Sequence, residues 1–142
     1  MEVVVDANIL FAALLKDGTT RELFLNDELH LFSPDYLIEE FIDHIDELER
    51  KTKIPGASLQ GSAIKLIVES NIIIVAKEDL IPFLKEAKQI TPDPDDALYL
   101  ATALKHQCSI WSNDNRLKKQ TAVRVYTTHE LLERLLTTHK RC

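Results

Sequence analysis

The sequence predicts a three-layer α/β/α protein whose central sheet is mostly parallel and has about five strands. The first observation is a set of short β-branched runs, which are typical of buried parallel strands; the run at 72–75 is expected to be fully buried. The second is that longer stretches with apolar residues at helical spacing separate these runs. The predicted strands lie at residues 3–5, 29–32, 72–75, 109–112 and 123–126.

End signals and apolar spacing define the predicted helices. Gly18 ends the first helical run, and a capping box at residues 127–130 starts the last helix. Pro34 is well placed as the first residue of the third helix, because proline favours that position. We expect Ile64 and Val68 to face the core. Helical patterns cover residues 9–14, 20–25, 37–48, 59–69, 80–89, 97–104 and 131–136.

The composition is that of an ordinary globular protein. The 142 residues are 45% hydrophobic, which is enough for one core and a single domain over residues 1–142. No apolar stretch approaches the roughly 20 residues of a membrane span. Cys108 and Cys142 lack the spacing of a metal knuckle or a disulfide framework, which favours a reducing, cytoplasmic setting. The net charge of −6 disfavours a sequence-reading DNA binder but leaves open a cation-dependent site.

Four groups of acidic residues are placed to meet at one edge of the predicted sheet. Asp6 follows the first strand and Asp114 follows the fourth, at the edge where open α/β sheets bind ligands. Glu39 and Glu40 lie early in the third helix, and residues 93–96 open a later one. Taken singly, most of these residues also fit an ordinary cap, a turn or a solvated helix face. A charged group that ends a buried strand, as Asp6 does, needs a partner or a cation.

In these segments the sequence resembles the PIN-domain family, the endoribonucleases that include VapC-type toxins. The matching segments follow the family's order: Val4–Leu10, Ser33-Pro34 with Glu40-Phe41, Asp93–Ala103 and Trp111–Asp114. The resemblance implies a PIN-like (Rossmann-like) fold and four catalytic metal ligands: Asp6, Glu40, Asp96 and Asp114. Supporting positions fall on Asn8, Glu39, Asp93 and Ser112. The sequence leaves open whether Glu39 or Glu40, and whether Asp93 or Asp96, is the main ligand.

The chemistry of clustered carboxylates agrees with this resemblance. Oxygen ligands suit Mg²⁺ or Mn²⁺, and such ions activate water for attack on a phosphodiester of RNA. Arg116, Lys118 and Lys119 are candidates for contacts with RNA phosphates. Without metal, we expect the crowded acids to repel one another, which raises some of their pKa values. Replacing Asp114 with Asn is then expected to stabilise the metal-free fold.

Two other functions fit parts of the sequence. A catalytically silent PIN-like binding or assembly module has the same fold but no need for four repelling carboxylates. An aspartate-nucleophile phosphatase also begins with a strand and an Asp, but usually carries a second Asp where this chain has Asn8. The family resemblance further implies a homodimer, for which residues 23–25 and 36–41 offer apolar side chains. It also implies either a toxin covered by an antitoxin or a stand-alone prokaryotic PIN protein.

Overall fold

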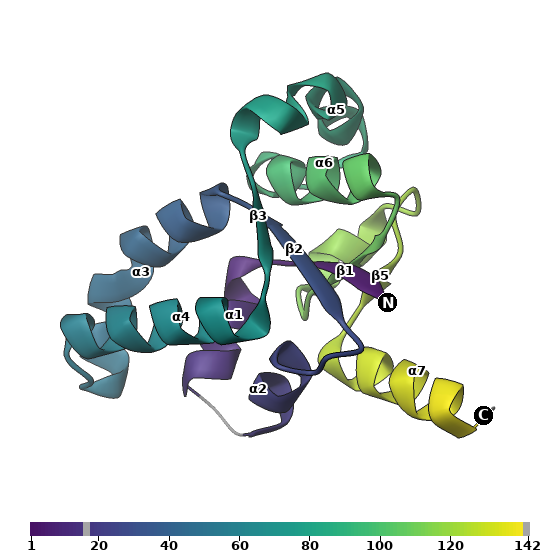
Figure 1. The fold of residues 1–142 in the computed structure, drawn as a ribbon. Helices are drawn as coiled ribbons and strands as arrows, with labels where there is room; N and C mark the ends of the chain where they lie inside the picture. The colour runs from purple at the N-terminus through teal and green to yellow at the C-terminus, as the bar shows by residue number, and fades with distance from the viewer. Residues whose placement is uncertain (16–17, 141–142) are drawn as a thin grey trace.

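A parallel sheet of five strands lies between two layers of helices in the computed structural model, which describes residues 1–15 and 18–140 (Figure 1). Side chains of residues 138–140 are outside this description, as is Cys142. The strands are β1 (Glu2–Val5), β2 (His30–Pro34), β3 (Ile73–Val75), β4 (Ser109–Trp111) and β5 (Val125–Tyr126). The helices are α1 (Ala7–Leu15), α2 (Gly18–Phe24), α3 (Tyr36–Thr52), α4 (Gly56–Ser70), α5 (Lys77–Ile90), α6 (Ala97–His106) and α7 (Thr128–Lys140). Two 3-10 helices, η1 (Pro94–Asp96) and η2 (Asn115–Lys119), complete the chain.

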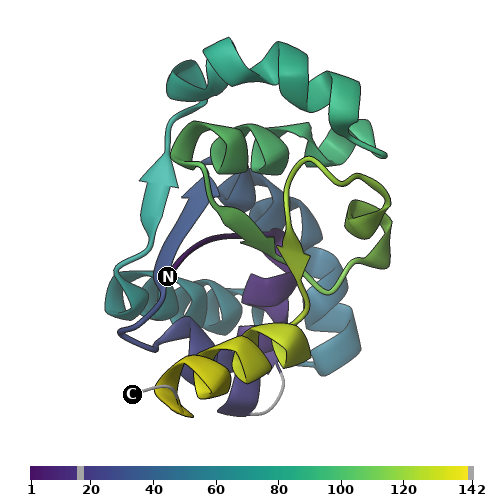
Figure 2. The same ribbon diagram turned by 90° about the vertical axis from the view of Figure 1, so that its right-hand side faces the viewer.

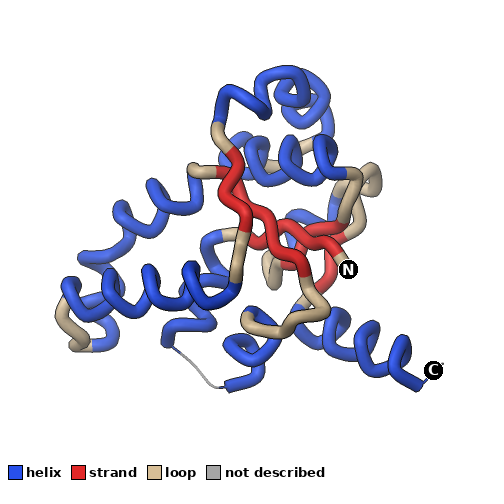
Figure 3. The backbone as a smooth tube through the Cα atoms, viewed as in Figure 1, coloured by secondary structure: helices blue, strands red, loops and turns tan. Residues whose placement is uncertain are grey.

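Strand β1 is the centre of the sheet, whose order is β3-β2-β1-β4-β5. The strands, red in Figure 3, lie in the middle of the molecule with the blue helices around them. Every pair is parallel, and Val4 of β1 lies between Phe32 of β2 and Ile110 of β4. Crossovers through helical segments join the strands, as the alternation of apolar runs predicted. The predicted three-layer α/β/α fold with about five parallel strands is therefore confirmed.

Alternate residues of β1 separate the two halves of the core. Val3 and Val5 pack with residues of α1, α2, α3, α4 and α7, and Val4 packs with residues of α5 and α6. Figure 2 shows α5 and α6 above the sheet and α7 on the opposite side. All three valines are fully buried because a parallel strand between two helical layers has no solvent face.

Pro34 does not begin a helix, contrary to the sequence-based expectation. It is the last residue of β2, opposite Val75 of β3, and α3 starts at Tyr36. Pro34 has no backbone N–H and so cannot donate a hydrogen bond to the Val5 carbonyl of the neighbouring strand. The buried Ser33 hydroxyl donates to this carbonyl instead, at 2.9 Å. The side chain of Ser33 therefore lets a proline end a strand beside the central β1.

Several apolar residues expected in the core are exposed. Ile64 and Val68 are 64% and 68% exposed because α3 and α4 form a pair that extends beyond the sheet (Figure 1). Ile73 is 53% exposed because β3 is an edge strand, so the run at 72–75 is not fully buried. Conversely, much of the surface considered for a dimer is core, since these residues are buried: Leu23, Phe24, Leu37 and Phe41.

Two further expectations concern the last helix and the membrane. Thr127 and Glu130 form the predicted capping box, with reciprocal backbone-to-side-chain hydrogen bonds of 3.0 and 3.1 Å. Over the described ranges, none of the helices combines the length and the apolar character needed to cross a bilayer.

Candidate metal centre

The site lies where the direction of the sheet's connections reverses. The chain passes from β1 to β2 on one side and later returns to place β4 on the other side of β1. The loops after β1 and β4 therefore diverge and leave a crevice at the carboxyl ends of these two strands. Asp6 directly follows β1, and Ser112 and Asp114 follow β4.

Asp6 is a buried carboxylate held by two donors. Asp6 is only 5% exposed, and its Oδ1 accepts a hydrogen bond from the backbone N–H of Ile9 at 3.1 Å. Its Oδ2 accepts the hydroxyl of Ser112, whose oxygen in turn accepts the backbone N–H of Asp114 at 3.1 Å. Burial nevertheless raises the pKa of Asp6 to about 6, because these donors only partly replace water.

Glu40 enters the site from α3 and is oriented by α6. The Tyr99 hydroxyl donates to its Oε1 at 2.6 Å, and Tyr99 is otherwise buried in the core. Burial raises the pKa of Glu40, and this hydrogen bond opposes the rise. Glu39 is exposed and does not line the cavity, so the structure brings Glu40 rather than Glu39 to the other acids.

Asp96 lies at the junction of η1 and α6 with a carboxylate oxygen that is not satisfied. Its Oδ2 is buried and has no hydrogen-bond partner within the described part of the chain. Burial, followed by repulsion from Asp93, Asp114 and Asp6, raises its pKa to about 6. A buried carboxylate oxygen without a donor is unfavourable unless a proton or a cation reaches it.

Asp114 lies in a different environment from the other acids, because Arg116 folds back onto it. The Arg116 Nε and one terminal nitrogen donate to the two Asp114 oxygens at 3.2 and 3.0 Å, and the Arg116 backbone N–H donates to Oδ1 at 2.9 Å. These contacts lower the pKa of Asp114. For Asp114 the structure therefore favours the opposite of the sequence-based expectation that Asp114→Asn is stabilising, since a guanidinium pairs with this acid.

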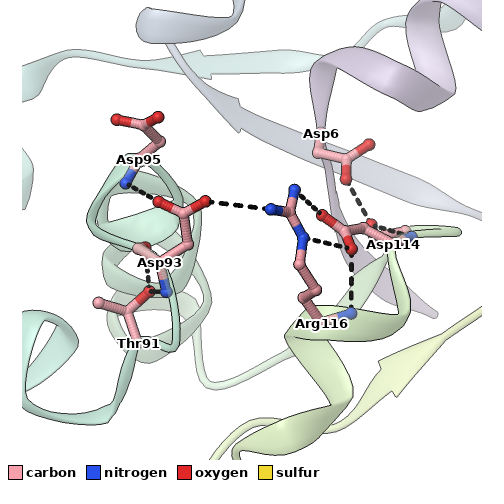
Figure 4. A network of polar contacts seen from close by, with 7 residues as sticks. Asp6, Thr91, Asp93, Asp95, Asp114 and Arg116 are labelled. Atoms are coloured by element: carbon pink, nitrogen blue, oxygen red, sulfur yellow. Dashed lines mark hydrogen bonds and ion pairs between the residues drawn. The ribbon is translucent and has the colours of Figure 1, made fainter.

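Asp93 contributes a cap and an ion pair. Its Oδ1 accepts the Asp95 backbone N–H at 3.0 Å and so caps η1, as a helix-start Asp commonly does. Its Oδ2 lies 3.6 Å from the second terminal nitrogen of Arg116, which Figure 4 shows between Asp93 and Asp114. Asp96, with its unpartnered oxygen, is more available to a cation than Asp93.

These residues surround one open cavity of about 200 Å³. Its lining includes all four of the acids predicted from the sequence. The complete lining is Asp6, Ala7, Asn8, Glu40, His44, Asp93, Asp95, Asp96, Tyr99, Asp114 and Arg116. Ser112 lies behind Asp6, whereas Lys118 pairs with Glu130 and Lys119 is exposed outside the lining. Sequence reasoning missed Tyr99 and His44, although Tyr99 lies in the first turn of α6, three residues after its N-cap Asp96.

The donor set fits a hard divalent cation. It consists of carboxylate oxygens, which Mg²⁺ and Mn²⁺ prefer, and it includes the unpartnered Oδ2 of Asp96. Among the residues with described positions, however, no three acidic, histidine or cysteine side chains already have the mutual geometry of a formed metal site. Arg116 forms ion pairs with both Asp114 and Asp93 at this site.

Fold and site together define a class: a doubly wound α/β protein with clustered carboxylates at its switch point. A family model described as PIN domain matches residues 4–136. The chain belongs to the PIN domain family, whose members are generally nuclease hydrolases, and the resemblance noted in the sequence is confirmed. No curated protein sequence matches the chain significantly.

Three of the solved structures with the same fold show the extent of the likeness. PAE2754 from Pyrobaculum aerophilum has 19% identity and a TM-score of 0.69, over 96% of this chain and 90% of its own. VapBC2 from Rickettsia felis, bound to a DNA fragment from its promoter, has 14% identity and a TM-score of 0.67, over 89% and 98%. A toxin–antitoxin complex from Klebsiella pneumoniae has 13% identity and a TM-score of 0.58, over 90% and 98%. At these identities the likeness concerns the fold.

Proposed function

We propose that this chain is a single-domain, Mg²⁺- or Mn²⁺-dependent endoribonuclease. The observation that carries the proposal is the convergence of Asp6, Glu40, Asp96 and Asp114 on one cavity, with Asp96 Oδ2 buried and unpartnered among the described residues. Carboxylates placed this close together repel one another, and a bound cation would offset this repulsion. Membership of the PIN domain family supports hydrolysis of a phosphodiester bond as the reaction.

The four acids have distinct roles in this proposal. Asp6, Asp96 and Asp114 would hold the ion, which when bound supplies charge neutralisation at the phosphate and a water of lowered pKa. Glu40 accepts the Tyr99 hydroxyl on Oε1, which leaves Oε2 free to hold a second ion or to orient the attacking water. Water attacks phosphorus and the P–O bond to the leaving nucleotide breaks, with no covalent intermediate on the protein.

The remaining residues hold the acids and the substrate. Ser112 and the Ile9 N–H fix the orientation of Asp6, and the exposed Asn8 beside it can donate an amide hydrogen to substrate or water. Arg116, Lys118 and Lys119 follow Asp114 on η2 and form a short basic segment for phosphates that flank the scissile bond.

The test is cleavage of structured RNA with Mn²⁺, alongside calorimetric measurement of Mn²⁺ binding. We expect Asp96→Asn to abolish both, and Glu40→Gln to reduce cleavage while the adjacent Glu39→Gln does not. Asp79→Asn on α5 removes an acid outside the cavity and controls for net charge. Mn²⁺ binding without RNA cleavage would favour the silent binding module instead. Trapping a phosphoaspartate at Asp6 would favour the phosphatase.

We further propose that this cytoplasmic protein forms a homodimer and is covered by an antitoxin. Two of the structures with this fold reported above, VapBC2 and the Klebsiella pneumoniae complex, are toxin–antitoxin assemblies. An apolar groove of about 290 Å³ between α3 and α4, bordered by the exposed Ile42 and Ile64, supports a protein partner. Sedimentation of Ile42→Glu against Ile81→Glu, an equally exposed residue on α5, tests whether this groove mediates dimer formation. A wild-type monomer would contradict the dimer.

A further inference from the structure

Arg116 connects two acidic segments across the opening of the cavity. Its guanidinium donates to both oxygens of Asp114, at 3.2 and 3.0 Å, and lies 3.6 Å from Asp93 Oδ2 (Figure 4). Asp93 belongs to the η1 segment and Asp114 to the loop after β4, so one side chain connects two loops that are separate in sequence. In the described structure, this cation faces the carboxylates where the proposed metal would bind.

The chemistry of this contact sets a divalent metal ion in competition with the guanidinium for Asp114. A guanidinium keeps its charge at all ordinary pH values, so it cannot leave Asp114 by losing a proton. Both Asp114 oxygens already accept from it, and Oδ1 also accepts the Arg116 backbone N–H at 2.9 Å. Three of the roughly four acceptor sites of the carboxylate are therefore used, so a divalent cation at Asp114 would compete for its oxygens and would repel the guanidinium at short range.

The geometry also allows the guanidinium to move away. The Arg116 side chain is 63% exposed, whereas Asp114 is 16% exposed and is fixed by its N–H bond to Ser112. Ion pairs at exposed positions are weak, and a long side chain can exchange one partner for solvent at little cost. The acid is therefore the fixed member of the pair and the guanidinium the displaceable one.

We propose that Arg116 is an internal counter-cation that pairs with Asp114 and Asp93 in the metal-free protein and releases Asp114 when a divalent ion binds. This inference rests on the proposed metal-dependent function. Arg116 is then a positioning residue that sets the threshold of ion concentration for activity. It also keeps the empty acidic site from driving its own loops apart.

The first test compares Mn²⁺ affinity by calorimetry in wild type, Arg116→Gln and Lys119→Gln. Lys119 lies exposed on the same 3-10 helix, and its substitution removes the same charge without an Asp114 contact among the described residues. We expect Arg116→Gln to bind Mn²⁺ roughly threefold to tenfold more tightly than Lys119→Gln, the range of one exposed charge-assisted contact. Equal or weaker binding by Arg116→Gln would overturn the inference.

The second test observes the guanidinium directly. In a ¹⁵N NMR titration with diamagnetic Mg²⁺, we expect the Arg116 Nε–H signal, assigned by its loss in Arg116→Gln, to move toward the position of a solvated arginine. A signal that stays unchanged while the Asp6 and Asp96 backbone signals respond to Mg²⁺ would overturn the exchange. If no variant binds Mn²⁺ or Mg²⁺, the proposed function fails with it; if wild type binds and Arg116→Gln matches Lys119→Gln, only this inference fails.

Discussion

The Tyr99 hydroxyl and the Glu40 carboxylate, 59 residues apart in sequence, are joined by a hydrogen bond of 2.6 Å. Tyr99 belongs to α6 on one face of the sheet, where its ring packs with Leu100 and Val4 in the core. Glu40 belongs to α3, whose apolar side packs in the other half of the core. One bond therefore fixes a helix from each layer at the crevice, and it orients the acid that faces the attacking water in the proposed mechanism.

Removing the Tyr99 hydroxyl tests this relationship. We expect Tyr99→Phe to lower the rate of RNA cleavage roughly tenfold or more, because a hydrogen bond to a charged group is worth about 1.5–3 kcal/mol. Calorimetry should find Mn²⁺ binding nearly unchanged, since Asp6, Asp96 and Asp114 are untouched. Tyr36→Phe is the matched control, because Tyr36 lies beside Tyr99 with ring centroids 6.1 Å apart. Equal losses of rate in both variants would mean that the loss does not come from the Tyr99–Glu40 hydrogen bond.

The Ser112 hydroxyl predicts a measurable effect on stability. Ser112→Ala removes the donor to buried Asp6 and the acceptor for the Asp114 N–H. We expect the free energy of unfolding in urea to fall by about 2–3 kcal/mol, because a buried charged group loses its partner. Ser33→Ala, which breaks a buried bond to the neutral Val5 carbonyl, should cost only about 1 kcal/mol. A smaller loss for Ser112→Ala than for Ser33→Ala would contradict the role given to Ser112.

The sequence was sufficient to predict the three layers and the meeting of four acids at one cavity. Both features are specified by residues that are neighbours in the sequence. The β-branched run that ends at Asp6 specifies both a buried strand and the edge at which its carboxylate emerges, since the ends of parallel strands coincide. Likewise, the Asp93–Asp96 segment followed by Ala97 specifies a helix start. Such features depend on a few neighbouring residues, so a single sequence is enough to predict them.

Long-range contacts account for what the sequence did not predict. The exposure of Ile64 depends on how far the α3–α4 pair projects beyond the sheet, which apolar spacing within α4 cannot indicate. The ring of Tyr99 is buried in the core, but its hydroxyl reaches Glu40 from another layer. Whether the pKa of Asp114 is raised or lowered depends on the conformation of Arg116. The sequence does not specify that conformation, because a side chain two positions away can equally turn toward solvent.

Asp96, rather than Asp114, is the acid whose neutral replacement should stabilise the metal-free protein. Asp96→Asn removes a charge from a buried, unpartnered oxygen of the described structure, and we expect a gain of about 1 kcal/mol after allowing for partial exposure. Asp114→Asn weakens the pairing with Arg116 and should cost a similar amount. Thermal melts in chelator measure both. With saturating Mn²⁺ the wild type should gain stability and Asp96→Asn should not, since it lacks a proposed ligand.

Stability of the metal-free protein should fall as pH rises, because burial raises the pKa of Asp6 from 3.8 to about 6. Between these values the folded state holds a proton that the unfolded state has lost, so folding is favoured at the acidic end. Relative to Asp6→Asn, we expect the wild-type free energy of unfolding to drop by roughly 1 kcal/mol between about pH 5 and about pH 7.5. The difference from Asp6→Asn isolates this effect from His106, whose lowered pKa acts in the opposite direction. A wild-type curve parallel to that of Asp6→Asn in urea titrations would show that Asp6 is ionised throughout, and that its two donors outweigh its burial.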